Sequence, residues 1–429
     1  MRVTALAKNC RFDYRVPRLR HFDASRGSRV EQNNRPLVVH HYYPLGSGNI
    51  GDHLVARALR ASFAKYFGPA DFVDMPVNDC YRAGDRTIGL RDDNLDRSNA
   101  EADVVLIGGS NLLEPRKQHH FAASGSDAQP DWGVFTGLAS IQRLRPPVLL
   151  AGMGTGSSFG KGIRRYSPRA REEIRLLHAR SVASAVRDET TATRLAQIGV
   201  HTECVGCPVT FFTDRAITAG DPQQPLIVSF PPSRIVRRFG GQRFMRQAMS
   251  YIEWLRVAGV RVVVTVHEAA DLDTVHDWVP QGTELFYSRD VDELVARYEN
   301  CRGVIGFRLH AALLGLGLGK PVIMVGVDWR SLAAIQTLGL QYYSIRAFRW
   351  AQFLKLRQLT DMLLRGSPAL IGRLDLAKAR FSARYDAFFR EAACRLTGAC
   401  GEQELSRLAP HPAVLRSQGM PGSSEKKVA

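Results

Sequence analysis

The chain has 429 residues, of which 45% are hydrophobic, and a net charge of +17. Its length exceeds that at which one hydrophobic core stops growing, so we expect two domains. No run of about 18 apolar residues occurs, which excludes a transmembrane helix. The N-terminal apolar patch ends at Lys8 and is too short for a signal peptide, so we expect a cytoplasmic protein.

The positive charge is concentrated at the two ends of the chain. Residues 1–35 hold nine Lys/Arg against three Asp/Glu, and residues 346–407 hold twelve against six. Such basic ends favour a peripheral position at the anionic inner face of the cytoplasmic membrane. No helix-turn-helix, zinc-finger or RNP-like pattern stands out, so we expect no nucleic-acid partner.

The seven cysteines are scattered along the chain and predict reduced thiols rather than a disulfide framework. Cys204 and Cys207 form one C-x-x-C, but a structural zinc site needs a second pair of similar spacing. We therefore predict no metal site.

Strand and helix patterns alternate along both halves of the chain. In the first half we expect strands at residues 37–43, 71–75, 103–108, 148–152 and 182–186. In the second half we expect strands at residues 226–230, 261–266, 285–287, 303–306 and 321–325. This alternation predicts an α/β protein with two Rossmann-like, doubly wound parallel-sheet domains facing a central cleft.

Composition divides the chain into five segments. We expect a basic N-terminal arm at 1–35, an N-terminal Rossmann-like domain at 36–215, a C-terminal Rossmann-like domain at 216–345, a helical region at 346–408 and a disordered tail at 409–429. The Gly/Pro-rich polar segment at 214–225 marks the junction between the two main domains.

The sequence Gly46–Asp52, GSGNIGD, follows the first strand and matches the spacing G-x-G-x-x-G. With Asp71 and Asp74 about 20 residues further on, this pattern is typical of dinucleotide sites. The alternative is a structural or anion-binding turn, in which Asp52 caps the helix that follows.

Glycines and polar side chains recur where other strands end. Gly108, Gly109 and Asn111 follow the third strand, and His267 and Glu268 follow the second strand of the second half. Ligands of open α/β sheets bind outside the carboxyl ends of the strands. We therefore expect these residues near one cleft.

Two arginines occupy equivalent places in the two halves. Arg187 follows the strand at 182–186, and Arg308 follows the strand at 303–306, each just before a helix whose N-terminus attracts anions. A guanidinium adds a planar fork for such an anion, and His310 can exchange a proton near neutral pH. The alternative is that Arg308 is a surface cation and His310 a packing residue.

Together these motifs resemble the polysaccharide pyruvyl transferase family. The resemblance spans about residues 36–345 and rests on N-x-G-D-x-x-V at 49–55, the glycine pair with Asn111, V-R-D at 186–188, and R-L-H at 308–310 ahead of Lys320-Pro321. It implies a glycosyltransferase-B-like fold and transfer of pyruvate from phosphoenolpyruvate to a sugar of a bacterial surface glycan or exopolysaccharide, forming a ketal.

The resemblance also implies roles for individual residues. Arg187 and Arg308 would bind phosphoenolpyruvate, and His310 would act with Arg308 in catalysis. The remaining donor-binding candidates are Asn49, Gly51, Asp52, Gly108, Gly109 and Asn111, while His267, Glu268 and Arg330 are candidates for the acceptor or the cleft. Phosphoenolpyruvate is then a co-substrate and no cofactor is implied. The other partner would be a glycan acceptor, either lipid-linked or free.

The sequence departs from the family pattern at three positions. Ser110 replaces a common third glycine, Arg330 stands where lysine is frequent, and Cys207 stands where an acidic residue is frequent. The last two positions bear on acceptor specificity.

Two other functions remain as alternatives. A nucleotide-sugar glycosyltransferase of the same fold often has two acidic residues near this strand-helix turn, but no Asp or Glu occurs between Glu299 and Asp328. A non-catalytic glycan-binding or scaffold protein is consistent with the charge and the fold.

Overall fold

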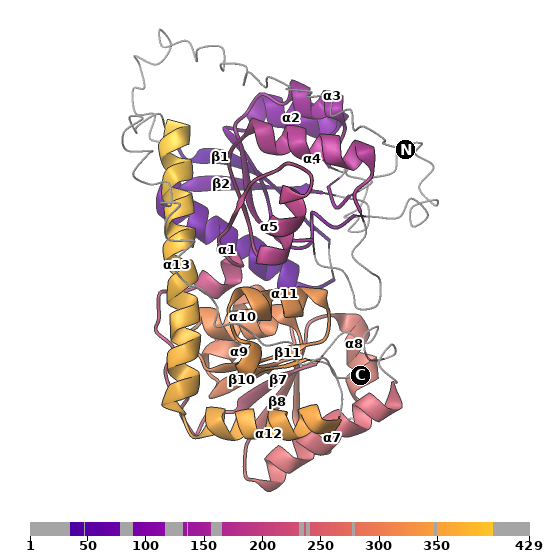
Figure 1. Cartoon of the computed structure of the whole chain (residues 1–429), viewed down its shortest axis with the longest axis vertical. Helices are drawn as coiled ribbons and strands as arrows, with labels where there is room; N and C mark the ends of the chain where they lie inside the picture. The colour runs from indigo at the N-terminus through magenta and orange to yellow at the C-terminus, as the bar shows by residue number, and fades with distance from the viewer. Residues whose placement is uncertain are drawn as a thin grey trace, which may run out of the picture. The chain divides into compact units, whose positions relative to one another are not determined.

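The computed structural model describes residues 35–46, 48–77, 89–115, 132–134, 136–155, 165–230, 236, 241–276, 279–346 and 350–397 (Figure 1). The described residues from Leu37 onward form one compact unit. The predicted tail and all of the predicted arm except Arg35 lie outside the described residues, and the predicted domain boundaries remain predictions.

The first sheet has six parallel strands in the order β2-β1-β3-β4-β5-β6. Its strands are β1 (Leu37–Tyr43), β2 (Ala70–Pro76), β3 (Val104–Gly108), β4 (Val148–Met153), β5 (Ser181–Val186) and β6 (Glu203–Cys204). The helices that accompany them are α1 (Ile50–Phe67), α2 (Asp92–Glu101), α3 (Leu138–Arg143), α4 (Pro168–Arg180) and α5 (Glu189–Ala196), with the 3-10 helix η4 (Pro208–Phe211).

The second sheet also has six parallel strands, in the order β12-β11-β10-β7-β8-β9. Its strands are β7 (Leu226–Ser229), β8 (Val262–Val266), β9 (Glu284–Tyr287), β10 (Gly303–Gly306), β11 (Val322–Gly326) and β12 (Ser344–Arg346). The helices of this part are α7 (Gln242–Val257), α8 (Ala269–His276), α9 (Val291–Glu299), α10 (Leu309–Gly317) and α11 (Trp329–Thr337), then α12 (Trp350–Leu364) and α13 (Pro368–Thr397).

Hydrophobic burial explains why the strands could be recognised. Every residue of β3, β8, β10 and β11 is buried, as expected for parallel strands covered by helices on both faces. The crossovers between parallel neighbours are helical, as such connections usually are. The predicted fold class, α/β with two Rossmann-like parallel sheets, is confirmed.

Helix α13 contacts elements that belong to both sheets. Lys378 Nζ donates to the carbonyl of Gly317 at the end of α10 at 3.2 Å, and Tyr385 Oη donates to Ser62 Oγ of α1 at 3.0 Å. Near its end, Arg395 donates to the carbonyl of Val182 at 2.9 Å. At about 1.5 Å per residue, the 30 residues of α13 reach about 45 Å, which accounts for the range of its partners.

Several local predictions were wrong or incomplete. The N-cap of α1 is Asn49, whose side chain accepts from the N–H of Gly51, whereas Asp52 lies within the first turn. The helices α2, α3, α8 and α11 were not predicted. Cys394 forms a disulfide, contrary to the expectation of reduced thiols, while Cys204, Cys207 and Cys301 are free and buried.

Within the described ranges, none of the helices combines the length and the apolar character that crossing a bilayer requires.

Candidate functional site

The first turns of α1 and α10 meet. The imidazole of His310, in the first turn of α10, lies so close to Gly51 that a Cβ there would come nearer than 3.0 Å to Nδ1. Next to this contact, the backbone N–H of Ile50 donates to the carbonyl of His267 at 3.1 Å. Residues that follow β1, β8 and β10 therefore converge, as expected at the carboxyl ends of strands.

His310 is buried, with 7% of its surface exposed. Burial, followed by the charges of Arg187 and Arg330, lowers its pKa well below the ordinary value. Its Nε2 has no hydrogen-bond partner among the described residues. His310 is therefore a neutral imidazole at neutral pH with one ring nitrogen available to a ligand.

Arg187 is held by the loops that follow β3 and β4. Its guanidinium donates to Asn111 Oδ1, and its Nε lies 3.5 Å from Asp188 Oδ2. A Cβ on Gly154 would come closer than 3.0 Å to Arg187 Nε, so glycine there makes room for the guanidinium. Asp188 also caps α5 by accepting from the N–H of Thr191 at 2.8 Å. These contacts fix the direction of the Arg187 side chain.

Arg308 is 6% exposed and is the N-cap residue of α10. Its Nε donates to the carbonyl of Phe230 at 3.3 Å, and its Nη1 donates to Glu268 Oε1 at 2.6 Å. Its Nη2 donates to Asp271 Oδ2. Arg308 is thus neither a surface cation nor an open clamp: two carboxylates and one carbonyl orient its guanidinium plane.

Arg330, which is partly exposed, and the buried Asp328 form a further ion pair after β11. Arg330 Nε donates to Asp328 Oδ2 at 2.6 Å. Asp328 also caps α11 through a capping box with Ser331, so the same carboxylate holds both the helix start and the arginine. Although burial opposes it, Arg330 and the hydrogen bonds from Ser331 lower the pKa of Asp328, and the pair stays charged.

These side chains enclose a small cavity of about 20 Å³. It is lined by Asn49, Ser110, Asn111, Arg187, His267, Phe307, Arg308, Leu309, His310, Val327, Asp328 and Arg330. A volume of this order holds about one water molecule. A larger ligand therefore requires the surrounding side chains or the two sheets to move apart.

The structure brings most of the predicted site residues together. The cavity is lined by Asn49, Asn111, Arg187, His267, Arg308, His310 and Arg330. Glu268 does not line it but accepts a hydrogen bond from Arg308. Gly51 contributes by making room for His310. Asp52 is buried in the first turn of α1, next to Asn49 Nδ2 at 3.4 Å, and is not among the lining residues.

Gly108 and Gly109 do not line the cavity. A Cβ on Gly108 would come within 3.0 Å of the Ala151 carbonyl and of Leu59, and one on Gly109 within 3.0 Å of Val55. These glycines allow the end of β3 to pack against α1 and β4, which is a structural role. Their place in the donor-binding set stays a prediction.

Sequence reasoning missed three polar residues of the site. Ser110 lines the cavity and has a φ of 56°, a left-handed conformation that favours glycine. Asp271 accepts a hydrogen bond from Arg308, and Asp328 accepts one from Arg330. Glu268 directly precedes α8 and Asp271 lies in its first turn, so the two carboxylates are three residues apart at the start of this helix.

His267 lines the cavity together with Arg308. Burial, followed by the charge of Arg308, lowers the pKa of His267 to about 3. Its Nε2 lies 3.4 Å from Tyr298 Oη. His267 is therefore a second neutral imidazole.

Cys204 and Cys207 lie outside this cavity. Both are buried, and burial raises the pKa of each thiol. Among the residues that the structure describes, no group of three or more His, Cys, Asp and Glu side chains has a geometry suited to a metal ion.

Comparison with known proteins gives one family. The family model for polysaccharide pyruvyl transferase matches residues 49–328, which include every cavity-lining residue except Arg330. No curated protein sequence matches the chain.

Similar solved structures include two UDP-GlcNAc 2-epimerases. The structure from Methanocaldococcus jannaschii in complex with UDP-GlcNAc and UDP has 10% sequence identity and a TM-score of 0.42, over 81% of this chain and 98% of that chain. The structure from Neisseria meningitidis bound to UDP-GlcNAc has 11% identity and a TM-score of 0.42, over 79% and 94% of the two chains.

Proposed function

Because the chain belongs to the polysaccharide pyruvyl transferase family, we propose that it transfers pyruvate from phosphoenolpyruvate to a sugar of an exopolysaccharide or cell-surface glycan, forming a ketal and releasing phosphate. One observation carries this proposal: His310 shares a buried cavity with Arg187 and Arg330 at the carboxyl ends of the strands. The proposal assigns the donor to this cavity.

The charges of the cavity suit a donor with a carboxylate and a phosphate. Guanidinium groups bind both kinds of anion through charge-assisted and often bidentate hydrogen bonds. Arg187 comes from the first sheet and Arg330 from the second, so one small anion could contact both halves of the protein. Arg308 already forms ion pairs with Glu268 and Asp271, and its proposed role is to hold the first turn of α10.

Ketal formation requires two proton transfers. Two sugar hydroxyl oxygens form bonds to the central carbon of phosphoenolpyruvate, and the bond from that carbon to the phosphate oxygen breaks. One hydroxyl proton ends on the methylene carbon, which becomes a methyl group, and the other leaves with the phosphate. A single base that later acts as an acid could serve both transfers.

His310 is the candidate for that base. Its lowered pKa keeps it neutral before the donor binds, so it could accept a proton from a sugar hydroxyl. Arg187 and Arg330 contribute to this lowering, and an anionic donor between them would raise the pKa of His310 again. The protonated imidazole could then deliver its proton to the methylene carbon.

Phosphate release tests the proposal. The protein would be incubated with phosphoenolpyruvate and a panel of lipid-linked and free oligosaccharides, with inorganic phosphate and the product mass measured together. The proposal predicts one phosphate per pyruvyl group gained. A product that gains a hexose from a nucleotide sugar would favour the glycosyltransferase alternative, and binding of glycans without turnover would favour the scaffold alternative.

We also propose that the basic ends of the chain attract it to anionic membranes. Their excess charge lies outside residues 49–328, which carry the family match. Binding to phosphatidylglycerol vesicles should decrease steeply with salt, because exposed charges are screened within about 10 Å at 0.1 M. Binding that is insensitive to salt would contradict this position.

A further inference from the structure

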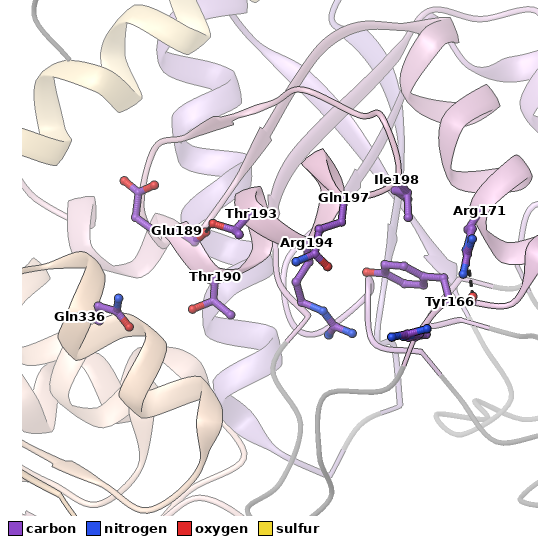
Figure 2. A pocket seen from close by; sticks show the side chains of 10 residues that line it. Tyr166, Arg171, Glu189, Thr190, Thr193, Arg194, Gln197, Ile198 and Gln336 are labelled. Atoms are coloured by element: carbon purple, nitrogen blue, oxygen red, sulfur yellow. Dashed lines mark hydrogen bonds between the residues drawn. The ribbon is translucent and has the colours of Figure 1, made fainter. Parts of the chain in front are cut away.

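A second, larger pocket lies along α5. It has a volume of about 770 Å³ and is lined by residues of α4, α5 and α11 and of the segment that precedes α4. Figure 2 shows Gln336 of α11 at one end of this pocket and Arg171 of α4 at the other, with the α5 side chains between them. Its volume lies within the range of known ligand sites.

The pocket is basic. Arg165, Arg171 and Arg194 line it, against the single carboxylate of Glu189. Three guanidinium groups in one pocket favour an anionic ligand.

Arg194 is the most buried of these arginines, with 8% of its surface exposed. Its guanidinium lies over the ring of Tyr166, 5.4 Å from the centroid, and the two side chains lie next to each other in Figure 2. Arg171 Nε donates to the carbonyl of Tyr166 at 3.1 Å. Burial lowers the pKa of Arg194, although Glu114 and Asp188 act in the opposite direction. A bound anion would offset part of this desolvation.

Short contacts connect this pocket to the cavity that holds His310. The carbonyl of Thr155 lies 3.5 Å from Arg194 Nη1, and the Thr155 N–H donates to Thr191 Oγ1 at 3.0 Å. Thr191 Oγ1 in turn donates to Asp188 Oδ1 at 2.8 Å, and Asp188 pairs with Arg187. Arg187 and Arg194 therefore lie on opposite sides of one small polar network.

Helix α11 gives a second connection. Trp329 and Gln336 are seven residues apart, so they lie on nearly the same face of α11 and about 10 Å apart along it. Trp329 is 36% exposed and directly precedes Arg330 of the cavity, while Gln336 lines the pocket. An indole offers a flat apolar surface to a sugar ring. A glycan whose reacting sugar is at the cavity would reach the pocket along this face.

We propose that the pocket along α5 binds an anionic group of the acceptor glycan, either a carboxylate on a sugar or a phosphate that joins the glycan to its carrier. This inference rests on the proposed function, because it assigns the pocket to the acceptor of that reaction. The pocket would then select acidic acceptors and hold them while a neighbouring sugar reacts.

Calorimetric titration without phosphoenolpyruvate tests the pocket separately from turnover. The probes are tetragalacturonate, inorganic pyrophosphate and the neutral maltotetraose. We expect one of the two anionic probes to bind at least tenfold more tightly than the neutral one. Preference for tetragalacturonate would identify a sugar carboxylate, and preference for pyrophosphate would identify a phosphate linkage. Equal affinity for all three probes would overturn the inference.

Thr193 offers a matched pair of variants, because it is exposed on α5 and lines the pocket. Thr193→Glu adds a negative charge, whereas Thr193→Gln has nearly the same shape without charge. The affinity for the anionic probe should fall at least fivefold in Thr193→Glu relative to Thr193→Gln. Equal affinities in the two variants would overturn the inference.

Arg194→Gln should lower the affinity for the anionic probe at least tenfold. The control Arg390→Gln, which removes an exposed arginine of α13, should change this affinity less than twofold. Phosphoenolpyruvate affinity is measured on the same variants and should stay within threefold of the wild type. If the anionic probe binds as predicted but phosphoenolpyruvate is never consumed, the pocket stands and the proposed function fails.

Discussion

His310 in the first turn of α10 and Gly51 in the first turn of α1 are in direct contact, because the imidazole occupies the space that a Cβ on Gly51 would need. We predict that Gly51→Ala displaces the imidazole and lowers turnover at least a hundredfold, since small misplacements of a reacting group have effects of this size. Because Gly51 is helical, alanine should leave the free energy of unfolding within about 1 kcal/mol of the wild type. Enzyme assays and urea denaturation measure both quantities.

The control for this variant is Gly372→Ala. Gly372 also lies within a helix, α13, but a Cβ there meets no atom within 4 Å. Its activity should be unchanged. Full activity in Gly51→Ala would mean that the position of His310 does not limit the reaction.

His310→Asn separates proton transfer from binding. Asparagine keeps some hydrogen bonding but cannot exchange a proton near neutral pH, so kcat should fall by about two to four powers of ten. The affinity for phosphoenolpyruvate should change much less. Near-normal kcat in a folded variant would show that His310 is a packing residue.

Arg308→Lys should damage the site although it keeps the charge. An ammonium cannot contact Glu268, Asp271 and the Phe230 carbonyl in the planar arrangement of the guanidinium. We expect kcat/KM for phosphoenolpyruvate to fall at least a hundredfold and the thermal midpoint to decrease. The matched control is Arg297→Lys, which alters an ion pair with Glu284 on the outside of the second sheet. Equal effects in the two variants would indicate a general loss of stability rather than a role in the site.

The pKa of His267 makes stability depend on pH. The folded value is about 3, below the ordinary 6.5, so between these pH values the unfolded chain binds more protons than the folded one. The contribution of His267 to stability is therefore complete above about pH 6.5 and is lost as the pH falls toward 3, by up to about 1.4 kcal/mol per pH unit. His267→Gln should reduce this slope in urea denaturation between pH 4 and 7.

The strands and the strand-end residues were predictable because both follow from local patterns. Fully apolar runs such as β3 and β11 are typical of buried parallel strands, and parallel strands bring their carboxyl ends to one edge. Arg187 and His310 could therefore be placed at one site without knowing the distances between them.

The partners of the arginines were not predictable in the same way. The contact of Arg308 with Asp271 depends on α8, a short helix without a strong apolar pattern, and on the strand order β10-β7-β8 in the second sheet. Sequence spacing also could not distinguish glycines that approach a ligand from Gly108 and Gly109, which make room for α1. The helix cap at Asn49 rather than Asp52 differs by three residues, within the usual uncertainty of helix ends predicted from sequence.

The central claim is that the cavity of Arg187, Arg330 and His310 binds phosphoenolpyruvate, and calorimetric titration with phosphoenolpyruvate and with UDP tests it without knowledge of the acceptor. We predict one phosphoenolpyruvate per chain, at least tenfold weaker binding in Arg187→Lys than in Arg297→Lys, and no competition by UDP. Competition between UDP and phosphoenolpyruvate for the cavity, or unchanged phosphoenolpyruvate affinity in Arg187→Lys, would contradict it.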